Sequence, residues 1–308
     1  MRIIVLGSAA GGGFPQWNSN APACRRARRG DPAATPRTQA SLAVSVDGLS
    51  WFLLNAAPDM RAQIDATPAL WPQTGLRSSP IAGVLLTGGD VDAVAGLLTL
   101  RERHRFSLYA TEEVHAVLAA NSIFRVLSPD SVVRRVLPLG TLTTLKRADE
   151  TVPGLMVEAF VVPGKVPLWL EEDGTDPGIV ETGHAIGLAI IETATGRRFL
   201  FIPGCAAMTP RLADRLRGAA LVFFDGTLWR DEEMILAEVG PKTGKRMGHM
   251  SMSGRDGVIA ALAGLDIARK VFIHINNTNP VLLADSPERA EAERAGWTIA
   301  HDGMELEL

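Results

Sequence analysis

Residues 84–98, VLLTGGDVDAVAGLL, constrain the fold of this chain more than any other stretch. The apolar run at 84–86 predicts a buried strand, and apolar residues at 91, 94, 97 and 98 recur with helical spacing after a glycine pair. Asp90 and Asp92 come where the loop turns into that helix. Open α/β sheets place ligand sites at this end of their strands. A carboxylate there can also cap the helix, so a site and a cap both stay open.

The pattern along the whole chain predicts one α/β (α+β) domain over residues 1–308. Strands alternate with helices throughout, and 46% of the residues are hydrophobic, which is enough for a core. We expect two mixed sheets between helical layers. Strand hairpins are expected near both ends, at 42–55 and at 297–308, and the proline-containing stretch 21–37 is expected to be a loop.

Charge and the N-terminal sequence limit the partners and the compartment. The net charge of −3 argues against a nucleic-acid partner. The apolar run at 1–6 is too short for a signal peptide or a membrane span. The chain has 2 cysteines, too few for a disulfide framework. These features predict a cytoplasmic protein without a membrane span.

Two loops are candidates for ligand contact. The turn at 7–13 has the spacing G-x-x-x-G-G-G, which does not match a dinucleotide fingerprint, so its glycines are expected to let the backbone approach a ligand or a neighbouring strand. Residues 163–177 form a long loop, and loops of that length are often lids or binding loops. Its Lys165 and Trp169 are candidate substrate contacts.

Polar residues recur where predicted strands end or where a loop meets a helix. Each alone has an ordinary structural explanation, such as a satisfied buried histidine. Together, carboxylates and imidazoles that converge in a cleft suit Zn²⁺, Fe²⁺ or Mn²⁺. These residues are, in chain order, Asp59, Asp90, Asp92, His184, Asp225, His249 and His274.

The order of these residues resembles that of the metallo-β-lactamase superfamily. There, T-H-x-H-x-D-H follows a strand, and G-H-x-x-G, a strand-terminal Asp and a final His come later. Within the superfamily the whole chain is similar to the family of pyrroloquinoline quinone (PQQ) biosynthesis protein B. The resemblance implies an αββα sandwich of metallo-β-lactamase type. It rests on LGSAAGGGFPQWN at 6–18, RTQ at 37–39, PDMR at 58–61, FDGTL at 224–228, MGH at 247–249 and IHINNTNP at 273–280.

The chain departs from that family pattern at two places. Gly88 and Asp90 stand where the superfamily has its first two histidines, and Ala93 stands where this family keeps a histidine after the aspartate. Members also carry a C-x-C-x-x-C cluster that resembles a structural zinc site. This chain keeps only Cys24 of that cluster, and a structural zinc needs four ligands, so we expect no structural zinc.

The resemblance implies a role in PQQ biosynthesis, as a non-haem iron oxygenase that hydroxylates the tyrosine-derived ring of a small or peptide-derived precursor. It assigns Asp92, Asp225 and His274 as metal ligands, with Asp90 and His249 as further ligands or as catalytic groups beside the metal. His249 is the candidate acid or base for the phenol. His184 matches the superfamily's G-H-x-x-G but ranks lower. The candidate substrate contacts are Trp17, Gly12, Asp59, Trp169, Asn276 and Asn277.

Three alternatives stay open at this point. Fe(II) is the expected cofactor, with Zn²⁺ as a second choice, and the loss of a ligand at Ala93 also allows a chain that holds no metal. A non-catalytic carrier that transports PQQ or its precursor to the periplasm is the alternative function. A zinc hydrolase ranks third, because the paired histidines of that fold are missing. The oligomeric state is open, with a homodimer as one choice.

Overall fold

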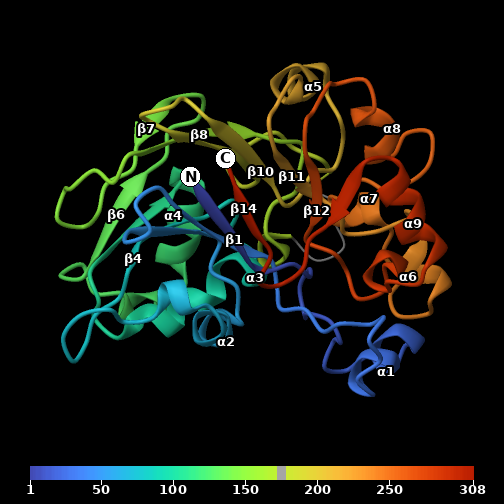
Figure 1. The fold of residues 1–308 in the computed structure, drawn as a ribbon, viewed down its shortest axis with the longest axis horizontal. Coiled ribbons are helices and arrows are strands. Elements are labelled where there is room, and N and C mark those ends of the chain that lie inside the picture. Colours follow the sequence, from blue (N-terminus) through green and yellow to red (C-terminus); the bar gives the residue numbers. More distant parts are fainter. Residues whose placement is uncertain (172–177) are drawn as a thin grey trace.

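Two mixed β-sheets packed face to face form the centre of the protein (Figure 1). The computed structural model describes residues 1–171 and 178–308. The two ends of the chain lie close together in the middle of the molecule, where the amino group of Met1 donates to the Leu308 carbonyl at 2.8 Å. Helices cover the outer faces of both sheets, so the predicted αββα sandwich is confirmed.

Within the described ranges each sheet has seven strands. The first sheet has the order β14 (Glu305–Glu307), β1 (Arg2–Gly7), β2 (Ser41–Ser45), β3 (Trp51–Leu54), β4 (Ile81–Leu85), β5 (Phe106–Ala110) and β6 (Val132–Val136). The second has the order β13 (Trp297–Ile299), β12 (Lys270–Ile273), β11 (Val222–Asp225), β10 (Arg198–Ile202), β9 (Ile186–Glu192), β8 (Leu155–Val161) and β7 (Leu142–Thr144).

The helices are short and follow the strands that they cover. The α-helices are α1 (Pro22–Arg28), α2 (Met60–Ala66), α3 (Val91–Val94), α4 (Glu112–Ala120), α5 (Pro210–Leu216), α6 (Glu233–Leu236), α7 (Gly244–Met247), α8 (Val258–Leu262) and α9 (Pro287–Arg294). The 3₁₀ turns are η1 (Pro68–Leu70), η2 (Ala95–Arg101), η3 (Ser122–Val126), η4 (Leu168–Leu170) and η5 (Pro280–Leu282). In the described part of the chain, no helix combines the length and the apolar character that a membrane crossing requires.

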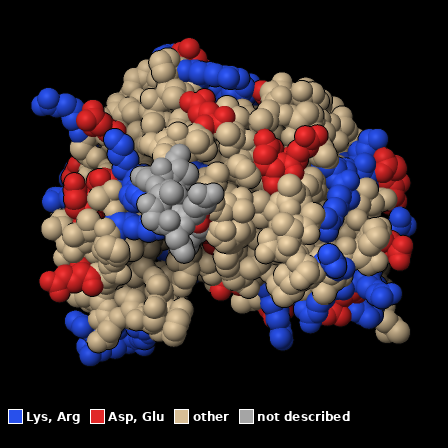
Figure 2. Space-filling model, turned by 180° about the vertical axis from the view of Figure 1, so that it is seen from behind, with Lys and Arg blue, Asp and Glu red and all other residues tan. Residues whose placement is uncertain are grey.

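Strand β1 shows why strands of the first sheet are apolar on both faces. Ile3 and Val5 point into the core between the two sheets, whereas Ile4 and Leu6 point into the core under the helices of the first sheet. Successive side chains of a strand point to opposite faces, so a strand covered on both faces reads as a continuous apolar run. Outside these cores, Lys, Arg, Asp and Glu side chains of both signs are interspersed on the face shown in Figure 2.

The structure corrects two of the predicted elements and contains a strand, β6, that the sequence did not indicate. Residues 21–37 are not all loop, because Pro22 occupies the first turn of α1, where its missing N–H costs no hydrogen bond. β13 and β14 do not form a hairpin: β13 pairs with β12 in the second sheet and β14 with β1 in the first. Strand β6 was not predicted, because Arg134 and Arg135 interrupt its apolar pattern.

Gly96 lets the turn after β4 pack directly on the backbone that follows β3. A Cβ at this position would lie 2.1 Å from the Ala57 carbonyl oxygen and 2.8 Å from that of Ala56. We expect Gly96→Ala to lower the free energy of unfolding by about 1–3 kcal/mol, because backbone atoms must move to admit the methyl group. Gly264→Ala is the matched control, with no described heavy atom within 4 Å of the added carbon. Equal urea midpoints for the two variants would contradict this account.

Candidate functional site

Asp225 and His274 come together because their strands are parallel neighbours. β11 pairs with β12 in a register that sets Asp225 opposite Ile273, and His274 follows directly. Both side chains therefore emerge at the carboxyl edge of the second sheet, where α/β folds place ligand sites. His274 has a φ of +60°, a left-handed conformation that costs a non-glycine residue roughly 1–3 kcal/mol. Strain of this kind is typical of functional positions.

Asp90 and Asp92 reach the same place from the first sheet, at the start of α3. A bridge between Gly88 and Ala185 joins the loop after β4 to the second sheet. Asp90 occupies the N-cap position of α3, but its side chain makes no capping hydrogen bond. Asp92 instead lies with Oδ2 2.8 Å from Nε2 of His274. A side-chain cap by Asp90 is therefore not supported, whereas Asp92 lies in the first turn of the helix.

The Thr227 hydroxyl lies among the groups of the second sheet. It donates to Asp225 Oδ1 at 2.7 Å and lies 2.9 Å from His274 Nδ1 and 3.1 Å from His249 Nδ1. Asp225 Oδ2 accepts from His249 Nδ1 at 2.7 Å and from the backbone N–H of Cys205 at 2.9 Å. Asp225 is fully buried, so each of these donors replaces a water molecule that the carboxylate has lost.

This network fixes the orientation of both imidazole rings, which stack with centroids 5.3 Å apart. The Thr227 hydroxyl faces Nδ1 of His274 and also lies 3.0 Å from the His274 carbonyl oxygen. His274 then presents Nε2 to Asp92. In metal-binding histidines, one ring nitrogen usually has a hydrogen-bond partner, and the other ring nitrogen binds the metal.

Burial and charge act in opposite directions on the pKa values of these groups. Burial by itself would raise the pKa of Asp92, but the hydrogen bond and the charge of His274 outweigh it, and that pKa lies below its usual value. The pKa of Asp225 is lowered in the same way, with His249 as the main opposing influence. For His274, burial lowers the pKa but Asp92 and Asp225 raise it further, so the net shift is upward. The geometry therefore favours an ion pair between the Asp92 carboxylate and the His274 imidazolium.

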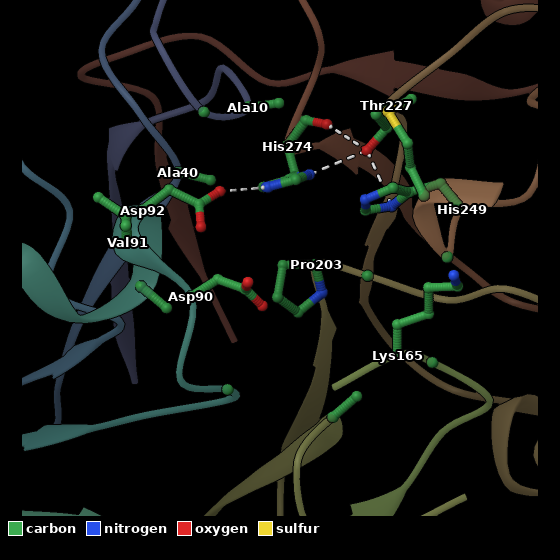
Figure 3. Close-up of a pocket in the computed structure, with 18 of the residues that line it drawn as sticks. Ala10, Ala40, Asp90, Val91, Asp92, Lys165, Pro203, Thr227, His249 and His274 are labelled. Carbon is green, nitrogen blue, oxygen red and sulfur yellow. Dashed lines mark hydrogen bonds and ion pairs between the residues drawn. The ribbon is translucent and has the colours of Figure 1, made fainter. Parts of the chain in front are cut away.

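Asp90, Asp92, Thr227, His249 and His274 line a cavity of about 820 Å³, whereas the fully buried Asp225 does not. Figure 3 shows Asp90 and Asp92 on one side of His274, with His249 and Lys165 on the other. A cavity of this size accommodates a small organic molecule. His184 also lines the cavity, as the G-H-x-x-G match suggested.

The structure separates the candidate substrate contacts into two groups. Gly12, Trp169 and Asn276 line the cavity. Trp17, Asp59 and Asn277 are not among its lining residues.

Each residue of the second group has a defined place elsewhere. Trp17 projects into solvent with 84% of its surface exposed. Asp59 Oδ2 accepts from the backbone and the side chain of Gln39, both at 2.9 Å, and Gln39 in turn accepts from the backbone N–H of Gly12 at 3.1 Å. Asn277 donates to Asn276 Oδ1 at 3.2 Å. Asp59 and Asn277 therefore support residues that line the cavity.

Three residues of the site were missed in the sequence. Thr227 lies inside the FDGTL phrase, but a threonine after a strand carries no chemical signal of its own. Lys242 and Arg246 line the cavity from around α7, and in the sequence they look like ordinary surface cations. Only the fold brings these two side chains to the cavity.

The donor set fits a divalent transition metal. Asp225, His249 and His274 offer ligand atoms that all lie within 4.8 Å of one another, and Asp92 is bonded to His274. Carboxylate oxygens and imidazole nitrogens suit Zn²⁺, Mn²⁺ and Fe²⁺. The carboxylate–imidazole contacts of 2.7 and 2.8 Å hold protons that a cation displaces when it binds.

Cys24 lies apart from this cluster. It is buried in α1, and its Sγ lies 3.6 Å from Asn277 Oδ1. The absence of a structural zinc at this position stays a prediction.

Comparisons with known proteins agree with this fold. Residues 50–275 match the family model described as the beta-lactamase superfamily domain. The chain is 62% identical to coenzyme PQQ synthesis protein B of Gluconacetobacter diazotrophicus, over 99% of this chain and 98% of that protein. It is 56% identical to the protein of the same name from Xanthomonas campestris pv. campestris strain B100, over the full length of both.

Solved structures support the same assignment. A crystal structure of Zn²⁺-bound PqqB from Methylobacterium extorquens matches with a TM-score of 0.94 and 52% identity, over 100% of both chains. A diphosphatase from the PhnP family matches with a TM-score of 0.68 at 20% identity, over 100% of this chain and 97% of that one, which indicates a shared fold only. This chain therefore belongs to the β-lactamase superfamily and, within it, to the family of coenzyme PQQ synthesis protein B.

Proposed function

We propose that this protein takes part in PQQ synthesis as a non-haem iron enzyme that hydroxylates the tyrosine-derived ring of a precursor. The single observation that carries this proposal is the cluster of carboxylates and imidazoles beside a cavity large enough for a small organic molecule. The names of the relatives supply the pathway. A metal site with mixed carboxylate and imidazole ligands and open positions is the general layout of non-haem Fe(II) oxygenases.

In this proposal Asp92, Asp225 and His274 hold the metal, and Asp90 lies beside them as a further ligand or catalytic group. Bound Fe(II) would supply the activation of O₂, and Zn²⁺ is the second candidate for the same ligands. Asp225 accepts the proton of His249 Nδ1, so that ring is held in one orientation toward the cavity. We assign His249 as the acid or base for the substrate phenol.

The remaining residues position the substrate. Gly12, Trp169 and Asn276 line the cavity and are the proposed contacts. Asp59 and Asn277 act on the substrate through Gln39 and Asn276, to which they are hydrogen-bonded. The contact between Trp17 and the substrate stays a prediction. The homodimer and the cytoplasmic location also stay predictions.

Oxygen uptake with product analysis tests the reaction directly. Iron-loaded protein would be mixed with a tyrosine- or DOPA-like substrate and ascorbate, which supplies the two electrons that a hydroxylation needs. We expect O₂ consumption together with a product that carries one added ring oxygen. Binding of PQQ or its precursor without metal and without turnover would favour a carrier that delivers it to the periplasm. Hydrolysis of an ester substrate would favour the zinc hydrolase.

The carrier alternative draws support from Ala93, which is 5% exposed, lines the cavity and offers no ligand atom.

We expect Ala93→His to raise the affinity for Fe(II) about 10–100-fold, the usual effect of one supporting group at a metal site. Ala93→Asn, which adds a polar side chain without an imidazole, is the matched control. Dissociation constants from anaerobic titration would show the difference. Equal affinities for Ala93→His and the unaltered chain would mean that position 93 does not reach the metal.

A further inference from the structure

Glu233 is a carboxylate that the proposed chemistry does not use. It is half-buried at the start of α6, next to Met234, which lines the cavity. Its Oε2 accepts from the backbone N–H of Trp229 at 2.7 Å, and its Oε1 accepts from the Thr278 hydroxyl at 2.6 Å. Burial raises the pKa of Glu233 to about 7 in spite of these hydrogen bonds, so the group is costly to ionise at this place. Glu233 thus joins the loop after β11 to the loop after β12.

The Thr278 hydroxyl connects Glu233 to Asn276, a residue that lines the cavity. An ionised carboxylate only accepts hydrogen bonds, so the hydroxyl uses its single proton for Glu233. The hydroxyl oxygen is then an acceptor, and Nδ2 of Asn276 donates to it at 2.7 Å. The carboxylate therefore decides which end of the Asn276 carboxamide faces Thr278.

The other end of the Asn276 carboxamide is held in the same direction. Its Oδ1 accepts from Nδ2 of Asn277 at 3.2 Å, and Oδ1 of Asn277 accepts from the Cys24 thiol at 3.6 Å. The donors all point along one path, which runs from Cys24 through the two asparagines and Thr278 to Glu233. In a chain of this kind each bond polarises the next, so the group at the end affects every member.

We propose that Glu233 is a positioning residue of this site, which acts through Thr278 and presents Asn276 to the cavity as a hydrogen-bond donor. Nδ2 of Asn276 carries two protons, and only one of them has an acceptor in the described part of the chain. The other is available to an oxygen atom of a molecule in the cavity. The inference rests on the proposed function in taking Asn276 as a substrate contact. The alternative is a structural role, in which Glu233 only joins the two loops.

NMR of the Asn276 side-chain amide tests the orientation without a substrate. Asparagine would be labelled with ¹⁵N in the full chain, and Asn276→Asp would assign the signal. Spectra with Zn²⁺ present would be recorded well above the pKa of Glu233, where its carboxylate is ionised. Glu233→Gln keeps the size of the side chain but adds a donor. Since the Trp229 N–H needs the new carbonyl oxygen, the new NH₂ group faces Thr278 and reverses its hydroxyl. We expect the Asn276 signal to shift.

Thr278 supplies a pair of variants that separates the hydroxyl from the shape of the side chain. Thr278→Val keeps the shape without the hydroxyl and should also shift the Asn276 signal, whereas Thr278→Ser keeps the hydroxyl and should leave the signal in place. Glu232→Gln is the matched control, because Glu232 is an exposed carboxylate directly before Glu233. It should leave the signal in place. An unmoved signal in Glu233→Gln and Thr278→Val would overturn the proposal, and so would an equal shift in Glu232→Gln. If Glu233→Gln fails to fold, the two Thr278 variants decide.

The hydroxylation assay separates positioning from a structural role. In iron-loaded protein with DOPA as the substrate, Glu233→Gln and Thr278→Val should each raise KM about 3–10-fold with little change in kcat, the effect of losing one neutral hydrogen bond. The double variant should lose no more than either single variant, because both changes break the same path. Fully additive losses, or an unchanged KM in both single variants, would overturn the proposal. A shifted Asn276 signal in a protein that hydroxylates nothing would refute the proposed function but leave the positioning of Asn276 standing.

Discussion

Replacing His274 by asparagine is expected to weaken metal binding by at least about 100-fold, because loss of a supporting group alone typically costs 10–100-fold. His274 contributes the nitrogen that faces Asp92 and lies within the cluster with Asp225 and His249. Asparagine is chosen because it tolerates a φ of +60° better than most residues, so the backbone of the site is kept. The variant therefore removes the ligand with little added strain.

Anaerobic titration with Fe(II) or Zn²⁺ measures this effect as a change in the dissociation constant. His301→Asn is the control, since His301 is exposed and lies at the turn between β13 and β14. It should bind metal like the unaltered chain. If His274→Asn retained the original affinity, the cluster at the ends of β11 and β12 would not be the metal site.

Asp225→Ala is expected to lower the free energy of unfolding by about 3 kcal/mol or more even without metal, because several buried hydrogen-bond donors lose their acceptor and each such loss typically costs about 1–3 kcal/mol. The carboxylate is fully buried and accepts from the backbone N–H groups of Cys205 and Thr227 at 2.9 and 3.0 Å. Its removal leaves these donors without an acceptor and also removes the hydrogen-bond partner of His249 Nδ1. Asp225 thus holds the loops of the site together as well as serving as a proposed ligand.

Urea denaturation in the presence of a chelator separates this structural effect from metal binding. Asp256→Ala removes an exposed carboxylate from the same half of the chain, and its free energy of unfolding should change by less than about 0.5 kcal/mol. A loss below about 1 kcal/mol for Asp225→Ala would place the carboxylate outside the stabilising network.

Local patterns in the sequence predicted most of the fold. The apolar run at 84–86 predicted a buried strand, which overlaps β4, and β2 and β3 pair as the predicted hairpin. The pairing of the last two strands, β13 and β14, could not be predicted from local patterns. β13 and β14 are separated by a short turn that looks like a hairpin connection, yet it carries the chain from one sheet to the other. Pairing between distant parts of the chain decides that outcome, and local sequence does not contain it.

The site was predictable where the residue type itself signals chemistry. Asp92, Asp225, His249 and His274 stood at element ends, and the structure brings them together. The sequence does not show which side chains form hydrogen bonds with one another. Thr227 was therefore missed, although it contacts three of these four groups. Trp17 was assigned as a substrate contact on the resemblance alone; its side chain is exposed and does not line the cavity, so that contact stays a prediction.

The measurement that tests the account most directly is an anaerobic Fe(II) titration of the unaltered protein, read by metal analysis after desalting. The account predicts one Fe(II) per chain, lost in His274→Asn and retained in His301→Asn. No iron in the unaltered chain, together with stoichiometric iron in Ala93→His, would contradict it. That result would mean that this chain has lost its metal, and it would favour the carrier.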